Sequence, residues 1–145
     1  MKNHFVANCY GIRRGKVLLG FHKKEGKWLP LGGHIKSGET PEEAVRREFR
    51  EESGLQVEFL TGKEYSSGKI KSLHQPQKMN LVCMGDHPLH INLIYFCRVK
   101  KGGEKISERE HRKLRWFSKG DIEKERLDAD VRLYAKEAIG FVSKA

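Results

Sequence analysis

The chain contains one helix whose two ends can both be located from the residues alone. Thr40 precedes a proline and is followed three residues later by Glu43, the pattern of a capping box with proline in the first helical position. Gly54 supplies the usual stop at the C-terminal end. Val45 and Phe49 are four residues apart, so they share one face of the helix. We therefore predict an amphipathic helix that packs this face against a core.

The same helix crowds carboxylates together. Glu48 lies three residues before Glu51 and four before Glu52, so these side chains reach one region of the helix surface. Like charges at this spacing destabilise a helix, whereas Mg²⁺ takes oxygen ligands and bridges carboxylates to phosphates. The alternative is a solvated surface helix whose acids pair with arginines one turn away. Helix stability alone does not favour this arrangement, so a cation site is one interpretation.

Charge is distributed unevenly along the chain. Lys and Arg number 29 against 19 Asp and Glu, a net charge of +10, yet residues 38–54 carry six acids and three arginines. The remainder of the chain is therefore strongly basic. An acidic cluster in a basic protein suits a cation-dependent site for a polyanionic substrate, although an acidic solvated helix has the same charge pattern.

The other segments indicate a sheet with few helices. Apolar runs between turn signals predict strands over residues 4–12, 17–21, 28–30, 55–60, 91–99 and 114–117, with further strands near 65 and over 79–84. The glycine-rich stretch 31–38 is expected to lack regular structure. Ser118 could cap a brief helix, and a final helix is expected from Asp128 onward, with Val131, Ala135, Ala138 and Val142 on one stripe. These elements predict a mixed-sheet α+β fold in a single domain, residues 1–145.

Composition argues against several classes of protein. No apolar run approaches the length of about 20 residues that a membrane-spanning helix needs, and the first ten residues do not resemble a secretory leader. Cys9, Cys83 and Cys97 are scattered and odd in number, which suits a reducing cytoplasm better than a disulfide framework. We expect a cytoplasmic protein without a membrane partner.

From Gly33 to Leu55 the chain reads GHIKSGETPEEAVRREFREESGL. This segment resembles the complete box of the Nudix hydrolases: Gly, five residues, Glu, seven residues, then Arg-Glu-apolar-any-Glu-Glu-any-Gly-apolar. No required position is substituted. The resemblance is nearest to the nucleoside triphosphate pyrophosphohydrolases of the mutator type, and it implies an α/β/α sandwich around a mixed sheet.

The resemblance also implies roles for individual residues. Glu48, Glu51 and Glu52 would hold Mg²⁺ or Mn²⁺, and the backbone at Gly33 would add an oxygen ligand. Arg47 would act with the catalytic acids and pair with Glu39 to orient them, and either Glu51 or Glu48 would be the general base. Glu110 occupies a place where some members carry a further metal-binding carboxylate, with Glu108 as its rival. The alternative for Glu110 is an ordinary acid in a charged loop.

The residues proposed to bind substrate rest on less specific patterns than the box acids do. Trp28 and Phe21 could stack on a base or belong to the core, and Arg13 and Lys27 could meet phosphate or simply be solvated. His34 beside the double glycine could touch phosphate, although a plain loop histidine is the more ordinary interpretation. Cys83, His87 and His90 fit no zinc finger or ribbon spacing.

The favoured hypothesis is Mg²⁺-dependent hydrolysis of a nucleoside diphosphate-linked substrate, above all a nucleoside triphosphate to monophosphate and pyrophosphate. An RNA 5′-pyrophosphohydrolase would use the basic surface, but the basic residues are not interleaved with aromatic ones in a stripe. A pyrophosphatase of ADP-ribose or NADH and a non-catalytic nucleotide-binding module are the remaining alternatives. The oligomeric state and the preferred base are left open.

Overall fold

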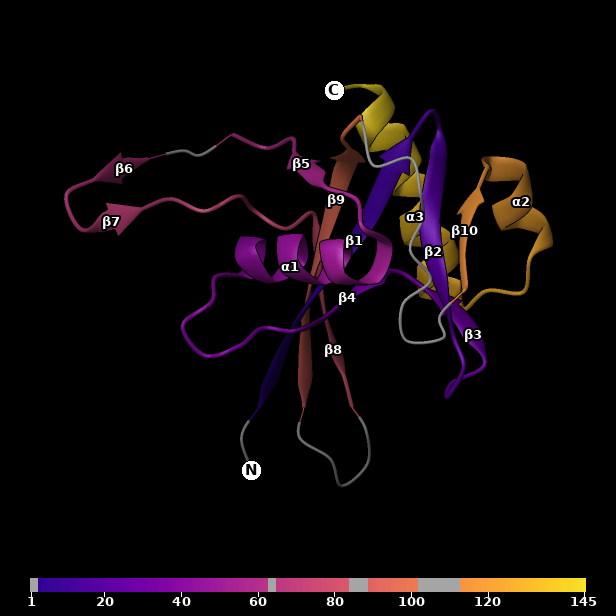
Figure 1. The fold of residues 1–145 in the computed structure, drawn as a ribbon, viewed down its shortest axis with the longest axis horizontal. Helices are drawn as coiled ribbons and strands as arrows, with labels where there is room; N and C mark the ends of the chain where they lie inside the picture. The colour runs from indigo at the N-terminus through magenta and orange to yellow at the C-terminus, as the bar shows by residue number, and fades with distance from the viewer. Residues whose placement is uncertain (1–2, 63–64, 84–88, 102–112) are drawn as a thin grey trace.

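The computed structural model describes residues 3–62, 65–83, 89–101 and 113–145 (Figure 1). Its strands are β1 (His4–Arg13), β2 (Lys16–His22), β3 (Lys27–Leu29), β4 (Leu31–His34), β5 (Val57–Phe59), β6 (Ser66–Ser67), β7 (Ile70–Lys71), β8 (Lys78–Val82), β9 (His90–Val99) and β10 (Lys113–Phe117). Its helices are α1 (Pro41–Ser53), α2 (Lys119–Lys124) and α3 (Ala129–Ser143). The predicted α+β class is confirmed.

Eight of the described strands form one mixed sheet. Its central order is β10-β2-β1-β9-β5, with β3 paired to β2, β4 to β1 and β8 to β9. β1 and β9 run parallel, and their register sets His4 opposite His90 and Ile12 opposite Arg98. The other strand pairs described in this sheet are antiparallel. The β6–β7 hairpin is separate and extends away from the sheet (Figure 1).

The two long helices cover opposite faces of this sheet, which makes the sandwich (Figure 1). Ala44, Val45 and Phe49 of α1 pack into one core, and the predicted apolar stripe of α3 packs into the other. α1 approaches β1 closely at Gly11, where an added Cβ would lie 2.6 Å from Phe49 Cζ. The middle of the sheet is therefore covered on both faces.

The capped helix forms as predicted. The Thr40 hydroxyl accepts from the Glu43 amide at 3.2 Å, and Glu43 Oε1 accepts from the Thr40 amide at 3.3 Å. Gly54 takes a left-handed conformation, φ 76°, and its amide donates to the Arg50 carbonyl at 2.7 Å. Both ends of α1 are thus fixed by local hydrogen bonds, so the position of its acids along the chain is determined.

One prediction about regular structure is wrong. The glycine-rich stretch was expected to be irregular, yet Leu31–His34 forms β4 and pairs with β1, with Leu31 opposite Cys9 and His34 opposite Val6. Glycine is a poor strand former in isolation. Here the close approach requires it, because a Cβ at Gly32 would lie 2.7 Å from Asn8 Cα. Tertiary pairing therefore overrides the local preference.

The connection between β7 and β8 contacts the N-terminal turn of α1. The buried Glu42 carboxylate accepts a hydrogen bond from the His74 amide, and the His74 ring stacks on Phe59 with centroids 5.1 Å apart. The hydroxyl of Tyr95 donates to the His74 carbonyl at 3.4 Å. Burial, together with the charge of Glu42, raises the pKa of Tyr95 to about 12. This segment is therefore anchored at His74.

Two observations concern the environment of the chain. No helix in the described ranges is both long and apolar enough to cross a membrane. Cys9 and Cys97 are buried, Cys83 is exposed, and all three are free thiols.

Candidate functional site

Arg47 organises the acidic side chains around α1. Its guanidinium forms two hydrogen bonds to Glu39, from Nε to Oε2 at 2.7 Å and from Nη2 to Oε1 at 3.0 Å. Nη1 donates to Glu48 Oε1 at 2.8 Å and to Glu51 Oε2 at 3.4 Å, and Nη2 also reaches the His34 carbonyl at 3.1 Å. One side chain therefore joins three carboxylates to the end of β4. Of the two pairs that a solvated helix would use, Glu42–Arg46 is present, with Arg46 Nη1 3.7 Å from Glu42 Oε2, whereas Glu43 belongs to the helix cap instead of pairing with Arg47.

The Arg47–Glu39 pair is electrostatically strong. The hydrogen bonds from Arg47 hold the pKa of Glu39 at about 2, well below its ordinary value of 4.5, and an amide hydrogen bond from Lys36 assists. The same pair raises the pKa of Arg47. Both side chains are mostly shielded, with 20% of Arg47 and 14% of Glu39 exposed. Both charges are therefore present at any pH near neutrality.

Two of the box acids contact the glycines of β4. The Gly32 amide donates to Glu52 Oε2 at 3.1 Å. A Cβ on Gly33 would lie 2.6 Å from Glu48 Oε1, so the Glu48 carboxylate lies against the bare backbone there. Glu51 is the more accessible acid, with 54% of its side chain exposed against 18% for Glu48. The acids of α1 therefore converge on β4.

The donor set suits a hard divalent cation. Carboxylates and a backbone carbonyl are the oxygen ligands that Mg²⁺ and Mn²⁺ prefer, and an arginine that fixes one oxygen of Glu48 restrains its orientation. Glu48, Glu51 and Glu52 are not gathered as tightly as ligands around one ion, because they do not form a set with all ligand atoms within 4.8 Å.

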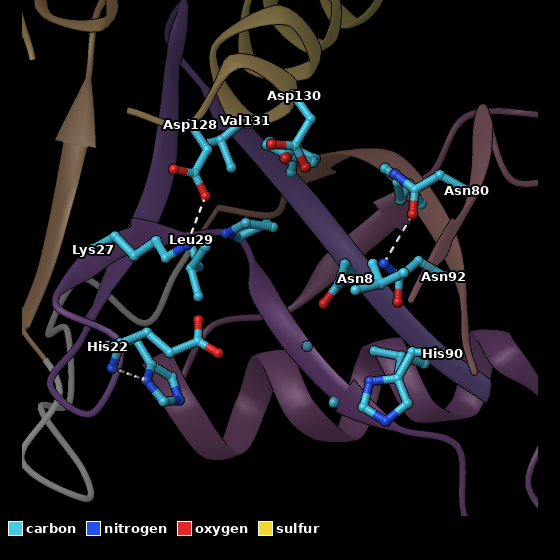
Figure 2. Close-up of a pocket in the computed structure, with 18 of the residues that line it drawn as sticks. Asn8, His22, Lys27, Leu29, Asn80, His90, Asn92, Asp128, Asp130 and Val131 are labelled. Atoms are coloured by element: carbon cyan, nitrogen blue, oxygen red, sulfur yellow. Dashed lines mark hydrogen bonds and ion pairs between the residues drawn. The ribbon is translucent and has the colours of Figure 1, made fainter. Parts of the chain in front are cut away.

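A cavity of about 500 Å³ opens on the sheet face that carries α3 (Figure 2). β1, β8 and β9 form its floor, and the start of α3 and the β2–β3 connection form its walls. Gly32 and Gly33 line it as well. β4 is therefore a shared wall, with the box acids against its backbone on one side and the cavity on the other.

Amides and carboxylates line this cavity. The Asn92 amide donates to Asn80 Oδ1 at 2.9 Å, and Lys27 Nζ donates to Asp128 Oδ2 at 2.9 Å (Figure 2). Asp130 lies beside Asp128 at the start of α3 (Figure 2). Burial above all, and then the charge of Asp130, raise the pKa of Tyr10 on the floor. Such groups can exchange several hydrogen bonds with a polar, flat ligand.

Of the four proposed substrate-binding residues, one lines the cavity and three do not. Lys27 lines the cavity and pairs with Asp128. Trp28 and Phe21 do not line it; they pack edge to face with centroids 5.3 Å apart, and Trp28 also meets Phe117 at 5.1 Å. For Trp28, which packs against the core on the α3 side, this matches the core alternative considered from the sequence; Phe21 is half-buried beside it.

Arg13 is also away from the cavity. Its guanidinium donates to the Lys100 carbonyl and lies 5.7 Å from the Trp116 ring centroid. Glu110 and its rival Glu108 lie outside the described residues.

The sequence analysis missed the groups that line the cavity. Asn8, Asn80 and Asn92 come from three strands, and only their register brings them together. Asp128 and Asp130 carried a weak signal, two acids at the start of a helix, but that pattern is ordinary helix capping. In the structure the Asp128 side chain makes no capping hydrogen bond and binds Lys27 instead.

Comparisons with known proteins support the resemblance to the Nudix hydrolases. The family model described as NUDIX domain matches residues 2–137. The uncharacterized Nudix hydrolase YvcI of Bacillus subtilis (strain 168) is 31% identical over 119 residues, which is 81% of this chain and 68% of that protein. An oxidized purine nucleoside triphosphate hydrolase of Danio rerio is 50% identical over 63 residues. That match covers 41% of this chain and only 38% of the zebrafish protein.

Solved structures extend the likeness to the whole fold. A hydrolase of the NUDIX family from Clostridium perfringens superposes with a TM-score of 0.81 at 31% identity, covering 98% of this chain and 99% of that one. A MutT NUDIX hydrolase from Burkholderia pseudomallei, at 22% identity and a TM-score of 0.62, shares the fold. With the intact box on α1 and a family match over nearly its full length, the chain belongs to the NUDIX family and is a Nudix hydrolase.

Proposed function

We propose that this Nudix hydrolase acts as one cytoplasmic domain, residues 1–145, and cleaves nucleoside triphosphates to monophosphate and pyrophosphate with Mg²⁺ or Mn²⁺. The observation that carries the proposal is the shared wall at β4. Arg47 and the box acids lie against its backbone, and the cavity lies on its other side. A nucleotide can therefore reach the acids with its phosphates while its base enters the cavity.

The residues that would hold the cation are Glu48, Glu51 and Glu52, with a backbone oxygen at Gly33. When bound, Mg²⁺ or Mn²⁺ supplies charge neutralisation at the phosphates and alignment of the attacking water. The protein's own part is orientation: Arg47 fixes Glu48 while Glu39 fixes Arg47. This chain of contacts supports a positioning role for Glu39 and Arg47.

Glu51 is the better supported of the two candidates for general base. Its contact with Arg47 is the longer one, 3.4 Å against 2.8 Å for Glu48, and its side chain is the more exposed. A general base must come within hydrogen-bond distance of the water that it deprotonates. We therefore assign the role of general base to Glu51 and the role of cation ligand to Glu48.

We further propose that the cavity receives a purine base. The carboxylate oxygens of Asp128 and Asp130 accept hydrogen bonds, so they suit the N–H groups on the edge of a purine, and the asparagine amides can pair with its other atoms. The name of the zebrafish relative, an oxidized purine nucleoside triphosphate hydrolase, supports this class. Canonical and oxidised purines then become the first substrates to compare.

The test is a substrate panel read by both pyrophosphate and phosphate release, with Mg²⁺ or Mn²⁺. It contains canonical and oxidised nucleoside triphosphates, triphosphorylated RNA, ADP-ribose and NADH. We expect pyrophosphate release from purine triphosphates. A Glu52→Gln variant should lose at least about a hundredfold in kcat. Glu58→Gln is the matched control, because Glu58 is an exposed acid paired with Arg98 on the sheet edge.

Equal turnover in wild type and Glu52→Gln would refute the box as the catalytic centre. Preferential turnover of triphosphorylated RNA with steep salt dependence would replace the nucleotide proposal with the RNA alternative. Turnover of ADP-ribose or NADH alone would move the enzyme to the pyrophosphatase class.

A further inference from the structure

We propose that His4, His34 and His90 form a binding site for a transition-metal cation of the Zn²⁺ type, distinct from the carboxylate cluster on α1. Within the described part of the chain they are the group of three potential ligands whose ligand atoms all lie within 4.8 Å of one another. Neutral imidazole is a preferred ligand of Zn²⁺, Ni²⁺ and Cu²⁺. The site requires no nucleotide and no hydrolysis.

The fold brings these residues together from three separate strands. His4 begins β1 and stands directly opposite His90, the first residue of β9. His34 ends β4 and stands opposite Val6, two residues along from His4 on the same face of the sheet. Diagonal neighbours on adjacent strands are within reach of long side chains. No spacing in the sequence shows this arrangement, because it depends on the register of two strand pairs.

One of the three distances between ligand nitrogens already matches that of a mononuclear site. His34 Nε2 and His4 Nδ1 lie 3.2 Å apart. Two nitrogens bound tetrahedrally to Zn²⁺ at about 2.0–2.1 Å from the ion are separated by about 3.3 Å. The rings of His4 and His90 lie 5.1 Å apart between centroids, and those of His34 and His90 lie 5.5 Å apart. A modest rotation of the His90 ring, which stacks on His4, would aim all three nitrogens at one point.

The surroundings favour a site with an open position. His90 lies at the end of the cavity away from Asp128 and Asp130 (Figure 2). His34, whose ring is in contact with that of His90, also lines the cavity. Three histidines leave a fourth tetrahedral position, which water or an oxyanion can fill from the cavity. The His34 carbonyl also accepts from Arg47, so the two cation sites share the end of β4. Nitrogen ligands on one side and oxygen ligands on the other make them selective for different ions.

The competing explanation is a metal-free cluster. His4 and His34 can form an N–H···N hydrogen bond of this length, with the His90 ring stacked on that of His4. The two explanations differ in what Zn²⁺ does. A built site binds one ion in competition with excess Mg²⁺, whereas a hydrogen-bonded cluster binds none.

The test measures Zn²⁺ binding to the full chain by calorimetry at pH 7.5 in millimolar Mg²⁺. Visible absorption of bound Co²⁺ serves as the probe of coordination. His34→Ala and His90→Ala are compared with two controls: His22→Ala, a histidine elsewhere in the same cavity, and Glu52→Gln in the box. We expect one equivalent of Zn²⁺ and tetrahedral Co²⁺ bands in wild type. Each ligand variant should bind at least about tenfold more weakly, and both controls should bind as wild type does.

Folding is checked by thermal unfolding of each variant without metal, and Zn²⁺ should raise the Tm of wild type but not of the two ligand variants. His34 is exposed, so its replacement is expected to leave the fold intact, and it decides the matter if His90→Ala unfolds. Absence of stoichiometric binding overturns the proposal. Binding that survives both ligand substitutions, or that Glu52→Gln abolishes, overturns it as well. None of these outcomes bears on hydrolysis, so the proposed function stands or falls separately.

Discussion

Arg47 and Glu39 form a two-pronged ion pair, with contacts of 2.7 and 3.0 Å, although they are eight positions apart in the sequence and only Arg47 lies on α1. The pair ties the loop after β4 to the helix that carries the box acids. It therefore affects two measurable properties of the enzyme, its stability in acid and the geometry of its carboxylates.

The first prediction concerns stability in acid. Glu39 has a pKa of about 2 in the folded chain, below its ordinary value of 4.5. A carboxyl whose folded pKa is depressed stabilises the fold fully above the unfolded pKa, and this stabilisation is lost as pH falls from about 4.5 toward 2. Urea midpoints of Glu39→Gln should therefore fall less steeply across this window than those of wild type. Parallel curves would contradict the pairing, and Glu58→Gln, from an exposed pair, should parallel wild type.

The second prediction concerns the shape of the arginine. Arg47→Lys keeps the positive charge but loses the planar fork that reaches Glu39, Glu48 and the His34 carbonyl together. We expect kcat to fall about ten- to a hundredfold while the chain stays folded. Steady-state kinetics and circular dichroism check this. Arg50→Lys, an exposed residue of the same helix, is the control, and an equal loss there would point to a general effect of the substitution.

The sequence predicted the part of this machinery that depends on local signals. The caps of α1, the spacing of its acids and the apolar stripe of α3 all follow from neighbours within one or two turns. β4 was missed because its glycines favour no strand until β1 is beside them. The cavity was missed for the same physical reason: Asn8, Asn80 and Asn92 meet only through the register of separate strands.

The third prediction tests the bare backbone at β4. In Gly33→Ala the new Cβ would lie 2.6 Å from Glu48 Oε1, so the carboxylate must turn away while the strand remains. We expect a large loss of kcat with little change in Tm. Gly140→Ala in α3 is the matched control, because nothing lies within 4 Å of its added Cβ. It should leave activity unchanged and stabilise the chain by about 0.5–1 kcal/mol. A fully active Gly33→Ala variant would show that the position of Glu48 does not matter for the reaction.

The fourth prediction separates recognition of the base from stability. Asp128→Asn keeps a good N-cap residue for α3 but removes the ion pair to Lys27, which is half exposed and screened by solvent, so it contributes little to stability. The change converts a pure acceptor into a group that also donates, so it should raise KM for purine triphosphates while Tm shifts by only a few degrees. Glu137→Gln removes a comparable pair to Lys78, at 2.8 Å, on the same helix but outside the cavity. It should leave KM unchanged. Asp128 lines the cavity and Glu137 does not. If both variants have the KM of wild type, other residues recognise the base.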